Sequence, residues 1–205
     1  MNIPCKICEK RSARRHCPGV GGDICPQCCG TGREITIDCP LGCPFLRDAR
    51  VHERPAPLTE KDIPNLDIQL KENFVQDHEH EVMALSLAMA RAMEQEKAVD
   101  LDAREAIESL VKTYRTLQSG LIYESRPQNP YAAGIQERLA QAIEELRNLM
   151  AEEAGMQTLR DTDVFATLVF LQRLEIQHNN GRRRGRAFFD FLRTYFPEPA
   201  PSVQI

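Results

Sequence analysis

The 205-residue chain contains no apolar run as long as a membrane span, and no apolar signal-peptide core follows Met1. These absences argue against a membrane protein and against a secreted one, so we expect a cytoplasmic location with reduced thiols. Glycine-rich phosphate-binding loops of the Walker or Rossmann type are missing as well. No serine nucleophile motif or acid–base pair of carboxylates is recognisable. The sequence therefore predicts a protein that is not an enzyme.

Cysteine is absent from residues 44–205, whereas eight cysteines lie within the first 43 residues. They are the pair Cys5-x2-Cys8, the single Cys17, the pair Cys25-x2-Cys28 with Cys29 directly after it, and the pair Cys39-x3-Cys43. A tetrahedral zinc site takes four such ligands, each with its sulfur about 2.3 Å from the ion. In a reducing compartment, clustered cysteines are typical of metal sites rather than disulfides. We therefore predict two structural Zn²⁺ ions, against the alternative of a disulfide-linked secreted module.

Two ligand schemes fit these spacings. In the crossed scheme the first site is Cys5, Cys8, Cys25 and Cys28, and the second is Cys29, Cys39 and Cys43 with Cys17 or His16. In the sequential scheme a zinc ribbon of Cys25, Cys28, Cys39 and Cys43 encloses a hairpin at residues 34–38, and the other site is Cys5, Cys8 and Cys17 with His16 or Cys29. We favour the crossed scheme because it joins both C-x2-C pairs on one ion and gives Cys29 a partner. One zinc with spare thiols is a third alternative.

The segment Cys25-Pro-Gln-Cys-Cys-Gly-Thr-Gly32 resembles the C-x2-C-x-G-x-G repeat of the cysteine-rich zinc domain of DnaJ-type chaperones, which it matches once. The His-Pro-Asp tripeptide of a J domain is missing, so the resemblance implies a shared zinc knuckle and not a shared activity. The overall cysteine spacing is also similar to small two-zinc modules of the HIT and MYND type and to bacterial zinc-ribbon proteins. The HIT and MYND resemblance implies a protein-interaction module.

Glycine and proline are dense around the cysteines, where they suit tight turns and defeat long helices. The β-branched alternation of residues 33–38 predicts a short strand, and residues 45–50 predict a short helix. Residues 1–54 are therefore expected to form a small, irregular, β-containing zinc module. Several prolines among charged residues predict that residues 55–66 are a proline-rich linker.

Helical periodicity then predicts an all-α bundle of four or five helices over residues 67–197. The expected helices are 68–97, a second from a cap at Asp100 or Asp102 to Gly120, 135–150, a fourth from a cap at Thr162 or Asp163 to His178, and 186–196. Prolines end the pattern, so residues 198–205 are predicted to be a disordered tail.

The charge of −4 is unevenly distributed, with about +3 in residues 1–54 and about −7 in the remainder. A basic module on an acidic body suggests an anionic partner for the module. Arginines cluster at two places, and the candidate nucleic-acid contacts are Arg11, Arg14, Arg15, Arg182, Arg183, Arg184 and Arg186. Nucleic-acid binding requires both clusters to share one exposed face. Pairing of the second cluster with acidic side chains is the competing interpretation.

Sites closed by four cysteines are structural, because catalytic zinc keeps a position open for water. The sequence therefore favours a non-enzymatic zinc-binding adaptor or scaffold that binds an unidentified protein partner. A nucleic-acid-binding regulator is the second hypothesis, and a thiol-based redox sensor, in which oxidation releases zinc, is the third.

Overall fold

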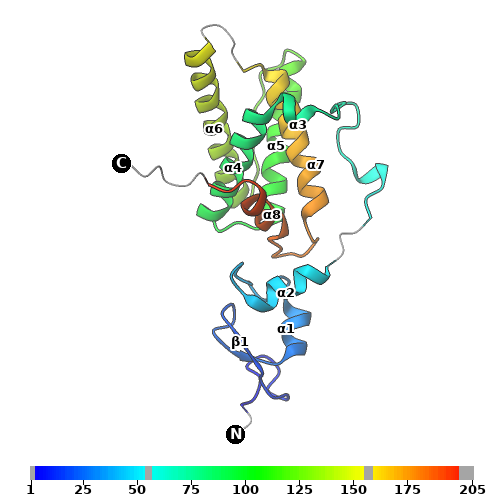
Figure 1. Cartoon of the computed structure of the whole chain (residues 1–205), viewed down its shortest axis with the longest axis vertical. Coiled ribbons are helices and arrows are strands. Elements are labelled where there is room, and N and C mark those ends of the chain that lie inside the picture. The colour runs from blue at the N-terminus through cyan, green and yellow to red at the C-terminus, as the bar shows by residue number, and fades with distance from the viewer. Residues whose placement is uncertain (1–2, 54–56, 155–158, 199–205) are drawn as a thin grey trace.

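The computed structural model describes residues 3–53, 57–154 and 159–198. Figure 1 shows two parts: a small cysteine-rich head at the N-terminus and a helical body above it. We use "head" for residues 3–53 and "body" for residues 57–198. The predicted tail, apart from its first residue, lies outside the described residues, as do residues 54–56 of the predicted linker.

The head contains a two-stranded antiparallel sheet and two short helices. Strand β1 (Arg15–Cys17) pairs with β2 (Gly22–Ile24), and helices α1 (Pro26–Gly32) and α2 (Pro44–His52) follow. Seven of the eight cysteines are buried, and they form a small core with Ile24, Ile37 and Leu46. The expected irregular module with a little β-structure and a helix after Phe45 is therefore present.

The strand predicted at residues 33–38 is wrong. These residues form a turn between a single bridge pair, Arg33 and Ile37, and Glu34 has a positive φ of 52°. The turn buries the Glu34 carboxylate completely instead of presenting a regular ladder. The real hairpin lies earlier and turns at Gly21, whose φ of +64° suits glycine.

The body is a bundle of helices around one apolar core. Its helices are α3 (Phe74–Asp77), α4 (Glu79–Gln95), α5 (Asp100–Gln118), α6 (Pro130–Ala154), α7 (Asp161–His178) and α8 (Ala187–Tyr195), with a 3₁₀ turn η1 (Glu60–Asp62) before them. Helix α4 packs against α6, and α5 packs against both α6 and α7. The short α8 closes the bundle against α4, near the head (Figure 1).

The periodicity predicted the bundle but placed some helix ends wrongly. The helix expected over 68–97 starts at Phe74 and is interrupted at His78, which leaves α3 as a separate turn. Helix α7 begins after Arg160, so Thr162 and Asp163 lie inside it and do not cap it. Gly120, with a φ of +80°, follows the end of α5 as expected.

Part of the predicted linker lies against the bundle. Asn65 donates a hydrogen bond of 2.6 Å from its amide to Gln172, and Arg173 donates to the carbonyl oxygens of Asn65 and Ile68. Arg115 pairs with Asp67 at 2.8 Å. Hydrogen bonds and an ion pair thus hold residues 65–68 against α5 and α7.

We expect residues 56–205 to fold without the head, because the bundle has its own apolar core and uses no cysteine. The isolated fragment should give a helical circular dichroism spectrum and a cooperative thermal transition. A disordered fragment would contradict this and show that the head completes the core of the body.

Candidate metal centre and its contact with the body

Four cysteines of the head converge on one point. The sulfur atoms of Cys5, Cys8, Cys25 and Cys28, which we call the first cysteine set, all lie within 4.8 Å of one another. The N-terminal turn supplies two of them, and the start of α1 supplies the other two. Thiolates at this separation can share one tetrahedral ion. This set is the first site of the crossed scheme. The zinc ribbon of the sequential scheme needs two of these cysteines in the other site, so the structure does not support that scheme.

Backbone N–H groups point at these sulfurs. The amide of Cys25 donates to Cys5 Sγ at 3.2 Å, and the amide of Cys28 donates to Cys25 Sγ at 3.4 Å. Burial opposes ionisation of Cys5, but the backbone donors of Cys8, Cys25 and Ile7 outweigh it and lower the pKa of Cys5 to about 6. The pKa of Cys28 is raised instead, through its hydrogen bond with Cys25 and through burial. Four adjacent thiols do not all ionise without a cation, so proton release would accompany metal binding.

The other four cysteines form a second group. Cys17, Cys29, Cys39 and Cys43, which we call the second cysteine set, are all buried and line one small cavity of about 10 Å³ between the hairpin, α1 and α2. No three of their sulfurs lie within 4.8 Å of one another, so among the described residues only the first cysteine set has the spacing of a metal site. Burial and the nearby charges of Glu34, Cys17 and Cys43 raise the pKa of Cys39 against the hydrogen bond it receives from the backbone of Glu34.

His16, the alternative fourth ligand, has a largely exposed side chain and holds Asp23 at 3.1 Å through Nδ1. Cys17 is therefore the better fourth member of the second cysteine set.

Each cysteine set has an arginine beside it. Arg11 Nη1 lies 3.9 Å from Cys8 Sγ, and Arg15 Nη1 lies 3.5 Å from Cys29 Sγ while its guanidinium stacks over Phe45. A divalent ion with four thiolates carries a net charge of about −2, which a neighbouring guanidinium offsets. Two of the three head arginines predicted to contact nucleic acid thus lie against the cysteine sets, and only Arg14 is well exposed without such a contact.

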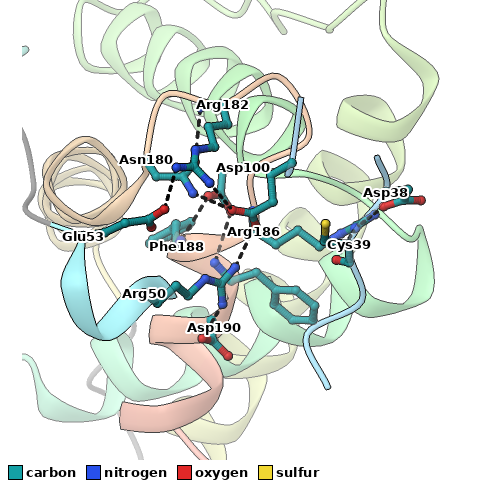
Figure 2. A network of polar contacts seen from close by, with 12 residues as sticks. Asp38, Cys39, Arg50, Glu53, Asp100, Asn180, Arg182, Arg186, Phe188 and Asp190 are labelled. Atoms are coloured by element: carbon teal, nitrogen blue, oxygen red, sulfur yellow. Dashed lines mark hydrogen bonds and ion pairs between the residues drawn. The ribbon is translucent and has the colours of Figure 1, made fainter. Parts of the chain in front are cut away.

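The head contacts the body through a buried carboxylate, and Figure 2 shows its partners Arg50, Asn180 and Arg186 from close by. Glu34 is 0% exposed and accepts hydrogen bonds from Arg50 (2.9 Å), from the amide of Asn180 (2.7 Å) and from the backbone N–H of Arg186 (3.1 Å). Its carbonyl oxygen accepts from the backbone N–H of Arg184 at 2.8 Å. We call these interactions, together with the ion pairs around them, the docking contact.

Ion pairs on both sides complete the docking contact. Arg50 of the head pairs with Asp190 of α8 as well as with Glu34. Arg182 reaches Glu53 at 2.7 Å, and Arg186 pairs with Asp38 (Figure 2). Of the four arginines in the turn before α8, two are therefore paired with head carboxylates.

Arg183 and Arg184 have exposed side chains. The hypothesis of a shared nucleic-acid face now depends chiefly on them and on Arg14.

Asp100 holds the start of α8. Its carboxylate accepts hydrogen bonds from the backbone N–H groups of Phe188 (3.0 Å) and Phe189 (3.2 Å), so it caps α8 from another helix. Both predicted N-caps lie inside α5, whose N-cap is Val99; Asp102 is its third residue and accepts from the N–H of Val99 at 2.8 Å. Burial raises the pKa of Asp100 to about 7, although the two backbone donors oppose the shift.

The raised pKa of Asp100 predicts a pH-dependent stability. Since the pKa is 3.8 without burial, the contribution of Asp100 is complete below that pH and is lost as the pH rises through about 7. From about pH 5 to about pH 8, the wild type should lose about 3 kcal/mol of unfolding free energy relative to Asp100→Asn, which cannot ionise. Denaturant titrations of both proteins measure the difference, and parallel pH profiles would contradict it.

Sequence reasoning missed Glu34 and Asn180, and it assigned Asp100 to the start of α5 rather than to α8. Within residues 33–38, Glu34 stands beside the apolar Ile35 and Ile37 with no feature that distinguishes it from Asp38. Asn180 and Asp100 gave no local signal, because their partners lie far away in the sequence.

None of the helices in the described part of the chain combines the length and apolarity needed to cross a membrane. No protein-family model matches the chain, and no curated protein or solved structure is significantly similar to it.

Proposed function

We propose that the chain is a non-enzymatic zinc-binding adaptor, in which two structural Zn²⁺ ions hold the head and the joined head and body bind a protein partner. The observation that carries this proposal is the closed character of the first cysteine set. Four sulfurs within 4.8 Å of one another would fill the tetrahedral shell of a bound ion and leave no position for water or substrate.

The second ion is supported by the second cysteine set. Its four cysteines are buried in the core of the head and help to line one small cavity, although no three of their sulfurs lie within 4.8 Å of one another, and Arg15 lies beside Cys29 as Arg11 lies beside Cys8. Zinc is the metal that all-cysteine tetrahedral sites typically hold, since thiolates are soft ligands. Both sites would then stabilise the fold of the head without taking part in a reaction.

The partner-binding role is supported by exposed apolar residues on the body. Leu121, Ile122 and Tyr123 lie in the loop after α5 with 62%, 97% and 66% of their surfaces exposed, and Leu117 precedes them. Contiguous exposed apolar side chains typically mark protein contacts. The docking contact holds the head in place on the same body, so one rigid particle would meet the partner.

Affinity purification of the intact protein from its native cell, with and without nuclease, tests this function. We expect a protein partner that survives nuclease treatment and is lost with Ile122→Glu. The matched control is Val75→Glu, which alters an exposed apolar residue on α3 and should retain the partner. Capture that depends on nucleic acid and weakens steeply with salt would support the nucleic-acid alternative instead. Zinc release by sub-stoichiometric peroxide would favour the redox alternative.

A further inference from the structure

We propose that the protonation state of Asp100 controls how firmly the head is held on the body. Neutral Asp100 keeps the turn before α8 and the start of α8 in place for the docking contact, whereas ionised Asp100 favours their release. The inference needs neither the metal ions nor the partner of the proposed function, because it depends only on residues at the junction of head and body.

The residues that the body contributes to the docking contact all lie in one short stretch, residues 180–190, which we call the docking segment. Those that bond to the head through a side chain or a backbone N–H are Asn180, Arg182, Arg184, Arg186 and Asp190. Movement of this one segment would therefore break these bonds together.

Asp100, the first residue of α5, holds the docking segment at three points. Its N–H donates to the carbonyl oxygen of Gly185 at 2.9 Å, and its carboxylate accepts from the backbone N–H groups of Phe188 and Phe189. Figure 2 shows Asp100 beside Phe188. Asp100 is only 3% exposed, and both phenylalanines are buried. Hydration of the carboxylate thus requires the docking segment, which covers it, to move away.

No arginine in the described part of the chain forms an ion pair with Asp100. Three arginines at the junction already have carboxylate partners, which are Glu175 for Arg104, Asp38 for Arg186 and Glu34 for Arg50. Glu175 of α7 is fully buried as well and adds a second negative charge near Asp100. A buried carboxylate without a cation favours its neutral form, and burial together with Glu175 raises the pKa of Asp100 to about 7.

Ionisation of Asp100 therefore opposes the closed junction, in which the docking segment covers the carboxylate. When the segment moves away, water solvates the carboxylate and its pKa returns toward 3.8. Since the closed junction has the higher pKa, it is favoured at low pH and loses this advantage as the pH rises through about 7. From about pH 5 to about pH 8, the equilibrium should shift about 100-fold toward the open junction.

Hydrogen exchange of the full-length protein tests this, because the N–H groups of Arg184 and Arg186 donate to Glu34 in the docked state. Protection factors, which are corrected for the intrinsic effect of pH on exchange, are compared at pH 5 and pH 8 in the wild type and in Asp100→Asn. Between these pH values, the wild type should lose about 100-fold more protection at both amides than the variant.

Arg50→Gln supplies the reverse test, since coupling between two sites is reciprocal. Arg50 pairs with Glu34 and Asp190 in the docking contact, so its loss should loosen the docking segment and admit water to Asp100. The midpoint of the Asp100 titration, read from the ¹³C chemical shift of its carboxyl group, should then fall clearly below about 7. Loss of a positive charge alone would raise this midpoint, so the direction of the shift separates coupling from simple electrostatics.

The internal control for exchange is the amide of Cys28, which donates to Cys25 Sγ inside the head and should respond to pH equally in the wild type and in Asp100→Asn. Equal loss of protection at Arg184 and Arg186 in these two proteins would overturn the inference. A midpoint that is unchanged or raised in Arg50→Gln would overturn it as well, and this measurement does not require Asp100→Asn to fold.

Discussion

Replacing Cys25 with alanine is expected to release the zinc of the first cysteine set and to unfold the head. Cys25 caps α1, accepting from the N–H of Cys28, and α1 carries Cys28 and Cys29, one member of each cysteine set. Structural zinc contributes about 10–16 kcal/mol of apparent binding free energy in small modules, which the apolar residues of the head alone would not replace. Zinc analysis and the one-dimensional NMR dispersion of head signals measure the result.

Cys8→Ser is the matched control for this prediction. It disturbs the same metal shell from the outer turn and leaves α1 intact, so we expect a smaller, local loss of structure. A folded head in Cys25→Ala that retains two zinc ions would contradict the assignment of Cys25 as a ligand.

Replacing Glu34 with alanine should lower the free energy of unfolding by about 3–5 kcal/mol. The side chain is fully buried, and its removal leaves the guanidinium of Arg50, only 13% exposed, with one carboxylate fewer. Arg50 keeps its ion pair with Asp190, but the amide of Asn180 and the backbone N–H of Arg186 lose their acceptor, and each buried donor left unpaired costs about 1–3 kcal/mol. Chemical denaturation followed by circular dichroism gives the difference.

The control here is Glu137→Ala, because Glu137 is exposed on α6 and such changes usually stay within about 0.5 kcal/mol. If both variants lose the same small amount of unfolding free energy, the docking contact does not contribute measurably to stability. The loss of the Asn180 and Arg186 hydrogen bonds in Glu34→Ala should also increase exchange at the turn before α8.

Local patterns explain what could be predicted from the sequence. Two C-x2-C pairs indicated the first cysteine set, since each pair places two sulfurs on one side of a turn. Helical periodicity indicated α5, α6, α7 and α8, because an amphipathic helix repeats its apolar face every three to four residues.

Interactions between distant residues explain the errors. Residues 33–38 have the alternating pattern of a strand. However, Asn180 and Arg186, about 150 positions away, donate hydrogen bonds to the Glu34 carboxylate, and these tertiary contacts outweigh the β-propensity of the segment. In the sequence, the arginines before α8 have the pattern of an exposed basic cluster. In the structure, Asp38 and Glu53 of the head form ion pairs with two of them. Strand β1 is three residues long, too short for a period of two to be recognised.

The most direct test of the central claim is the metal content of the full-length protein purified under reducing conditions. We predict close to two zinc ions per chain, with about one lost in Cys8→Ser and about one in Cys43→Ser. A metal-free wild-type protein with its eight cysteines joined in four disulfides would contradict the account.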